Sequence, residues 1–163
     1  MRFILVFVLT VVFSVSALSQ AKIDKALKKW NKESVPYITV DALSEMNHIL
    51  LFDAREREEY EVSHLENAVW VGAKSFELDS IAAKYPDKSA EIVVYCSIGV
   101  RSENIGDKLQ KAGYYQVKNL YGGIFRWKNE GYPVFNPNGQ ETDSVHAFSK
   151  HWGKLLTKGD KVY

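Results

Sequence analysis

Two short, uninterrupted apolar runs, residues 49–52 (ILLF) and residues 92–95 (IVVY), constrain the fold of this chain most strongly. Neither run shows the polar alternation of a strand with one face in water, so we expect strands buried on both faces, as in parallel sheets. Segments with helical periodicity follow, at residues 76–85 and around Ile105 and Leu109. Strands that alternate with helices of about ten residues predict a three-layer α/β domain with a mostly parallel central sheet flanked by helices.

The chain divides by composition into four parts. We expect a signal peptide at residues 1–19, a helical N-terminal extension at 20–36, the α/β domain at 37–135 and a helical C-terminal tail at 136–163. Both extension helices are expected because apolar residues recur at helical spacing. These residues are Ile23, Leu27 and Trp30 in the first extension and Val145, Phe148, Trp152 and Leu155 in the second.

The N-terminus has the features of an export signal. An apolar run at residues 3–18 is followed by small residues at the −3 and −1 positions of a cleavage site, Ala17 and Ser19. We therefore expect cleavage after Ser19, with Gln20 first in a periplasmic or secreted protein that keeps no stable membrane anchor. The alternative is an uncleaved anchor, because the run is only slightly shorter than the roughly 18–20 residues that span a bilayer.

Charge and cysteine content limit the partners. Cleavage would remove one of the 21 basic residues, leaving 20 against 20 acidic residues and a formal charge of zero. Nucleic acids and anionic membranes require a basic face, so we expect neither as a partner. We also expect the protein to be a monomer. The single cysteine, Cys96, cannot form an internal disulfide, so it is either buried and inert or chemically used.

The residues around Cys96 favour a chemical use. Cys96 ends an apolar strand and precedes a loop with Gly99, then Arg101 and a helical pattern. Backbone N–H groups at a helix start and the helix dipole favour the thiolate, which is the nucleophilic form. Gly99 allows the loop amides to point inward, and Arg101 supplies a fixed charge and a fork of donors for an anion.

Three segments resemble the rhodanese-type sulfurtransferase family. Residues 96–101 (CSIGVR) resemble the family's Cys-x-x-Gly-x-Arg active-site loop. Residues 51–71 (LFDAREREEYEVSHLENAVWV) resemble its Asp-x-Arg-x-x-x-Glu-Tyr-x-x-Gly-His-Ile segment, and residues 119–134 (NLYGGIFRWKNEGYPV) resemble its Gly-Gly-Ile-x-x-Trp-x-x-x-Gly-x-Pro ending. The resemblance covers roughly residues 38 to 135, with one departure at Ser63, where the family commonly has glycine.

The resemblance implies a persulfide mechanism. Cys96 would take sulfur from thiosulfate, a polysulfide or a small-molecule or protein persulfide, and pass it to a thiol or to cyanide, with no metal or organic cofactor. Cys96 and Arg101 are the expected catalytic residues. The expected substrate-binding residues are Ser97, Ile98, Gly99, Val100 and Arg101.

Other functions stay open. A non-catalytic sulfur carrier or protein-binding module is one alternative, and a phosphatase or arsenate reductase of the same fold is a more distant one. Those oxyanion enzymes have five residues between cysteine and arginine, whereas this chain has four, Ser97 to Val100, a loop sized for a single sulfur. The neutral Ser97, Ile98 and Val100 also predict weak thiosulfate binding.

The remaining polar candidates are interpreted as structural. Asp53 and Arg55 at a strand end, and His64 in a turn, are expected to support the loops around the site without a catalytic step of their own. His146 and His151 are five residues apart, not at the i, i+4 spacing of a helical metal pair, so we expect surface residues.

Overall fold

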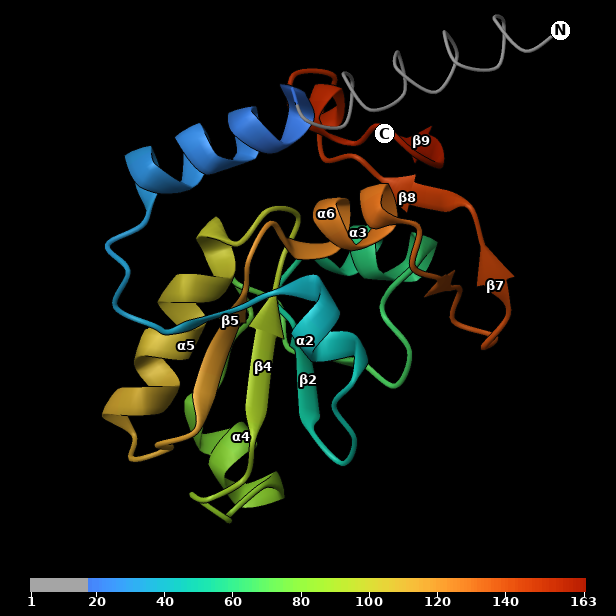
Figure 1. Ribbon diagram of the computed structural model, residues 1–163. Helices are drawn as coiled ribbons and strands as arrows, with labels where there is room; N and C mark the ends of the chain where they lie inside the picture. The colour runs from blue at the N-terminus through green and yellow to red at the C-terminus, as the bar shows by residue number, and fades with distance from the viewer. Residues whose placement is uncertain (1–17) are drawn as a thin grey trace, which may run out of the picture.

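The computed structural model describes residues 18–163, so the expected signal peptide lies almost entirely outside the described residues, at positions 1–17. A five-stranded parallel sheet with the order β1-β5-β4-β2-β3 forms the centre of the molecule (Figure 1). Its strands are β1 (Tyr37–Ile38), β2 (Leu50–Asp53), β3 (Val69–Trp70), β4 (Ile92–Tyr95) and β5 (Val117–Leu120). The α/β class and the parallel sheet expected from the sequence are confirmed.

Helices cover both faces of the sheet. They are α2 (Val40–Ser44), α3 (Arg57–Val62), α4 (Leu78–Lys84), α5 (Val100–Lys111) and α6 (Gly123–Glu130). Successive residues of a strand point to opposite faces. Val93 of β4 packs in one core cluster with Ile124 of α6, whereas Val94 and Cys96 pack in the other with Ile105 of α5. The apolar run of β4 is therefore uninterrupted because each face is covered by a helical layer.

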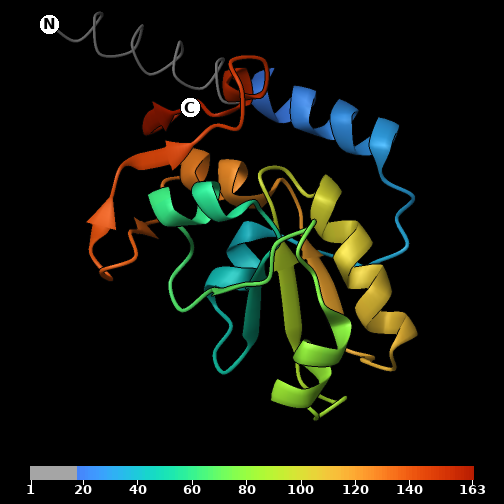
Figure 2. The ribbon, with the colours of Figure 1, turned by 180° about the vertical axis from the view of Figure 1, so that it is seen from behind.

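Residues 18–30 form a helix that lies beside the C-terminal tail, across the end of the sheet where the strand arrows end (Figure 1 and Figure 2). Ile23 and Leu27 are buried in the same core cluster as α6. Glu103 of α5 accepts hydrogen bonds from the backbone N–H groups of Lys32 and Ser34, both at 3.0 Å, and so ties the following linker to α5. No helix within residues 18–163 has the length and apolar content to cross a bilayer.

The C-terminal tail is not the helix expected from its apolar spacing, and that prediction is wrong. It contains β7 (Glu141–Thr142), β8 (Ser144–His146), the 3-10 helix η1 (Trp152–Leu155) and β9 (Asp160–Val162), and β6 (Val134–Phe135) directly precedes it. Val145 is buried in β8, which pairs in parallel with β9. Phe148 has φ +62°, a left-handed conformation that interrupts an α-helix. The apolar residues thus make separate contacts with the domain.

Polar contacts hold the tail against the domain. Asn129 of α6 donates from Nδ2 to the carbonyl oxygen of Leu155 (2.8 Å) and accepts at Oδ1 from the N–H of Thr157 (2.6 Å). The hydroxyl of Ser63 donates to the carbonyl oxygen of Ser144 at 2.6 Å. The hydroxyl of Ser19 donates to the same Leu155 carbonyl, at 2.6 Å. Both extensions are therefore part of one packed structure with the domain.

Candidate active site

Cys96 lies at the carboxyl end of β4, where the chain turns into α5. The loop depends on Gly99, which caps α5 with φ +108°, a conformation that favours glycine. A Cβ at Gly99 would lie 3.2 Å from the carbonyl oxygen of Leu120, so the space is tight as well. In this conformation the N–H of Gly99 points back at Cys96 and lies 3.2 Å from Sγ. The local sequence thus directs a backbone donor at the sulfur.

The surroundings of Cys96 lower the pKa of its thiol below the ordinary value. Burial acts first and raises it, because the side chain is 1 % exposed. The positive charge of Arg101 and hydrogen bonds from Ser102 and from the N–H of Gly99 act in the opposite direction and together prevail. The net effect is a larger thiolate fraction near neutral pH, which makes Cys96 a nucleophile.

The first turn of α6 supports the loop from below. The N–H of Ile124 donates to the carbonyl oxygen of Cys96 (3.0 Å), and the N–H of Phe125 donates to that of Ser97 (3.1 Å). A Cβ at Gly123, whose φ is +55°, would overlap the carbonyl oxygen of Cys96. The absence of a side chain at Gly123 therefore lets a helix N-terminus approach the backbone of the reactive loop.

Arg101, in the first turn of α5, is held by Glu59 of α3. Its Nη1 lies 2.6 Å from Oε2 of Glu59 and its Nη2 lies 2.9 Å from Oε1, a bidentate pair. Nη2 also donates to the hydroxyl oxygen of Ser97 (2.8 Å), and that hydroxyl donates to Oε1 of Glu59 (3.1 Å). Both terminal nitrogens of the Arg101 guanidinium, which the sequence analysis assigned to a substrate anion, thus have partners within the protein.

Glu59 is the site residue that the sequence analysis missed. It stands in the charged segment REREEYE, which has the composition of a solvated helical turn, yet Glu59 is 2 % exposed. Burial raises the pKa of its carboxyl, whereas the hydrogen bonds and the charge of Arg101 lower it. The net pKa is below the ordinary value. The signal in the sequence that could have identified Glu59 is its position as the glutamate of the Glu-Tyr pair in residues 51–71, the segment that resembles the family.

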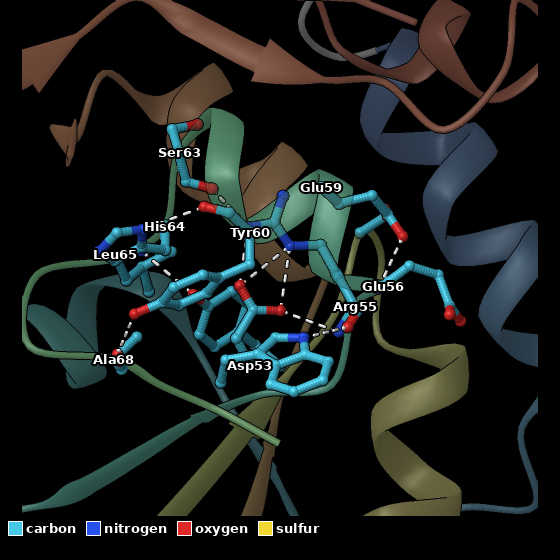
Figure 3. A network of polar contacts seen from close by, with 12 residues as sticks. Asp53, Arg55, Glu56, Glu59, Tyr60, Ser63, His64, Leu65 and Ala68 are labelled. Atoms are coloured by element: carbon cyan, nitrogen blue, oxygen red, sulfur yellow. Dashed lines mark hydrogen bonds and ion pairs between the residues drawn. The ribbon is translucent and has the colours of Figure 1, made fainter. Parts of the chain in front are cut away.

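Asp53 and Arg55 form a fully buried ion pair at the end of β2 (Figure 3). Nη2 of Arg55 lies 2.7 Å from Oδ2 of Asp53 and 2.5 Å from the carbonyl oxygen of Ser63, which the guanidinium thereby fixes. Ser63 has φ −169°, extended backbone that any residue adopts, so no glycine is needed there. Neither member of the pair lines the pocket above Cys96, as expected for supporting residues.

His64 is held in a turn. Its backbone N–H and carbonyl pair with Phe135, and its ring stacks on Tyr60 with 4.0 Å between the ring centroids (Figure 3). Nδ1 lies 3.2 Å from the carbonyl oxygen of Tyr60. Burial is the largest effect on the pKa of this imidazole and keeps it below the ordinary value, so the ring is neutral near neutral pH. His64 does not line the pocket above Cys96.

A pocket of about 210 Å³ opens directly above Cys96. Four of the five predicted substrate-binding residues line it, and Gly99 lies beneath, against Sγ. The remaining wall comes from three aromatic side chains of the two extensions, Trp30, Phe148 and Trp152. The full lining is Trp30, Cys96, Ser97, Ile98, Val100, Arg101, Phe148 and Trp152.

The described residues offer no obvious metal site. Within residues 18–163, no three histidine, cysteine or acidic side chains are grouped closely enough to hold a metal ion. Nδ1 of His146 accepts a hydrogen bond from the N–H of Phe148 (3.1 Å), and His151 is exposed beside Trp152. The reactive group at the site is a thiol of lowered pKa in a small pocket.

Residues 37–130 match the family described as Rhodanese-like domain. The thiosulfate sulfurtransferase GlpE of Coxiella burnetii is 27% identical over 96 residues, which cover 59% of this chain and 87% of that protein. The tRNA uridine(34) hydroxylase of Erwinia tasmaniensis is 30% identical over 102 residues, 58% of this chain; the chain spans only 29% of that protein's length.

A solved structure with the same fold is the rhodanese-like domain of the Alr3790 protein from Anabaena sp.. The TM-score is 0.56 at 24% sequence identity, over 62% of this chain and 79% of that one. The three aromatic pocket residues from the extensions lie outside the segment that matches the family.

Proposed function

The chain belongs to the rhodanese-like domain family, and from that premise we propose that it is a sulfurtransferase which carries sulfur as a persulfide on Cys96. One observation carries the proposal: a buried thiol of lowered pKa, with a loop amide 3.2 Å from its sulfur, at the floor of an open pocket. This arrangement makes a nucleophile and gives its product anion a donor.

The first half-reaction loads the sulfur. The Cys96 thiolate attacks the outer sulfur of the donor, the sulfur–sulfur bond of the donor breaks, and the electron pair leaves with the rest of the donor. With thiosulfate, Cys96–S⁻ and S–SO₃²⁻ give Cys96–S–S⁻ and sulfite. The N–H of Gly99 already faces the sulfur and stabilises the anion on the loop side.

The second half-reaction unloads it. A thiolate or cyanide attacks the outer sulfur of Cys96–S–S⁻, the Cys96 sulfur–sulfur bond breaks, and the pair returns to Sγ. The thiolate that is regenerated is the form that the charge of Arg101 favours. The same environment therefore activates the nucleophile in the first step and improves the leaving group in the second.

Loop geometry favours sulfur over phosphate as the group transferred. Four residues separate Cys96 from Arg101, and α6 closes the loop from beneath through Ile124 and Phe125. Arg101, the residue that would clamp a phosphate, is paired with Glu59. A phosphatase would need that fork of donors for its substrate.

The pairing of Arg101 also bears on the sulfur donor. The neutral loop side chains and a guanidinium that is already paired with Glu59 leave little to hold a doubly charged thiosulfate. We therefore propose a polysulfide or a persulfide as the preferred donor. A KM for thiosulfate in the low micromolar range would contradict this choice of donor.

A non-catalytic carrier or binding module is the second candidate, and turnover separates the two. Wild-type protein with a polysulfide and cyanide is expected to form thiocyanate over many turnovers, and Cys96→Ser no faster than the two reagents react without protein. Hydrolysis of p-nitrophenyl phosphate, measured beside it, is expected to stay at the buffer rate. A single turnover without recycling would support the carrier, and thiocyanate from Cys96→Ser at the wild-type rate would overturn the proposal.

A further inference from the structure

The wall of the pocket above Cys96 is built by parts of the chain that the family match does not include. Trp30 ends the N-terminal helix, and Phe148 and Trp152 belong to the tail, whereas the match covers residues 37–130. The reactive loop thus supplies the nucleophile and the two extensions supply the surface that a substrate meets.

The aromatic wall is held in position by polar contacts. Asn31, next to Trp30, donates from Nδ2 to the carbonyl oxygen of Gly99 at 2.9 Å, which joins the helix end to the reactive loop. Phe148 keeps a left-handed backbone, its N–H donates to Nδ1 of His146, and its ring lies 5.0 Å from the Arg101 guanidinium. The ring is therefore fixed over the pocket although 49% of Phe148 is exposed.

The pocket is apolar at its wall and offers little free charge. The Arg101 guanidinium is paired with Glu59, and the other loop side chains in the lining are Ser97, Ile98 and Val100. Exposed aromatic side chains beside a nucleophile leave apolar surface that a substrate can cover. The volume of about 210 Å³ exceeds the roughly 150 Å³ that suffices for benzene.

We infer that this pocket selects an organic thiol acceptor with an apolar group the size of an aromatic ring next to its sulfur. The inference rests on the proposed function. In the step concerned, the acceptor thiolate R–S⁻ attacks the outer sulfur of Cys96–S–S⁻, the sulfur–sulfur bond to Sγ breaks, and the products are R–S–S⁻ and the Cys96 thiolate. The group R packs against Trp30 and Phe148, so the extensions determine which thiols are served.

A matched pair of reagents tests the selectivity without any sulfur transfer. S-benzyl and S-methyl methanethiosulfonate both place R–S on a thiolate and release methanesulfinate, and intact mass follows the single cysteine. The rate at which each reagent modifies Cys96 is divided by the rate at which the same reagent modifies free cysteine, and the two corrected rates are compared as a benzyl-to-methyl ratio. We expect wild type to favour the benzyl reagent at least about tenfold. The ratio should fall several-fold in Phe148→Ala and in Trp30→Ala.

Tyr115→Ala is the control, because Tyr115 is also aromatic and exposed but precedes β5, at the opposite end of the sheet from Cys96. Its ratio should match wild type. Thermal unfolding shows whether each variant is folded, and the half-exposed Trp30 and Phe148 make folded variants the expectation. A wild-type ratio near one, or a ratio that Trp30→Ala and Phe148→Ala leave unchanged, would overturn the inference.

The transfer step itself is then compared in persulfide-loaded protein with benzyl mercaptan and 2-mercaptoethanol, two thiols of similar pKa. Faster transfer to benzyl mercaptan, lost in Phe148→Ala, supports the inference. Equal transfer to both thiols overturns the inference and leaves the sulfurtransferase proposal standing. Failure of every donor to load Cys96 with sulfur overturns the sulfurtransferase proposal. The benzyl-to-methyl ratio of modification rates then still decides whether the pocket selects an aromatic group.

Discussion

At the scale of single residues, Glu59 determines how the reactive loop is held. Its carboxylate is buried, pairs with Arg101 through two hydrogen bonds and accepts a third from Ser97. Arg101 in turn lowers the pKa of Cys96. The charge that activates the thiol is therefore positioned by a carboxylate that does not line the pocket.

Glu59→Gln is expected to lower the free energy of unfolding by about 2 kcal/mol at pH 7, because a charged hydrogen-bond pair is lost from a buried position. The folded-state pKa of Glu59 lies below its ordinary value of 4.5. Its contribution is therefore complete above pH 4.5 and is lost as the pH falls through the lower folded-state pKa. Urea unfolding of both proteins from pH 7 downward measures this difference.

Glu61→Gln is the matched control. Glu61 lies on the same helix and pairs with Arg57, but both side chains are 55% exposed. Its effect should stay below about 0.5 kcal/mol. A Glu59→Gln difference as small as that of Glu61→Gln, or one that does not shrink in acid, would contradict this account of the loop.

Residue-level features of the site follow from the sequence where they depend on local chain geometry. Cys96 and Gly99 were identified from their positions after an apolar run, and the structure places a Gly99 amide against the sulfur. Glu59 and the pairing of Arg101 were not identified, because they depend on where the fold places α3 relative to the first turn of α5. Charged residues in a helical turn have the same composition whether they face water or a partly buried arginine.

At the scale of elements, the junction of α6 with the reactive loop is the contact that positions Cys96. The first N–H groups of a helix have no partner within the helix, and here two of them bond to carbonyls of the loop. That approach is possible only because Gly123 has no side chain toward the Cys96 carbonyl.

Gly123→Ala is expected to destabilise the protein by more than the roughly 1–3 kcal/mol of a strained backbone alone, because the new methyl group also overlaps the loop. Gly113→Ala separates the two effects. Gly113 has φ +91°, but a Cβ there meets nothing within 4 Å. Denaturant unfolding should give Gly123→Ala a lower free energy of unfolding than Gly113→Ala. Equal losses of unfolding free energy would show that the close approach of α6 to the reactive loop is unimportant.

At the scale of the whole molecule, the sequence predicts the central sheet and the helix of the N-terminal extension, but not the structure of the C-terminal tail. The buried strands are identifiable because each covered face requires apolar residues, and β4 coincides with the predicted strand at residues 92–95. The tail was mispredicted because two of its apolar residues, Val145 and Leu155, are buried by partners that are distant in the sequence. Ser63 and Asn129 bond to the tail across 81 and 26 residues, and no local periodicity encodes such contacts.

The account predicts a persulfide on Cys96, and intact-mass measurement tests it most directly. Protein is incubated with thiosulfate in one arm and with a polysulfide in the other, and Cys96→Ser is treated in parallel. Wild type is expected to gain the mass of one sulfur atom, more completely from the polysulfide, and to lose it on addition of cyanide. Wild type that gains no sulfur from either donor, or Cys96→Ser that gains as much as wild type, would contradict the central claim.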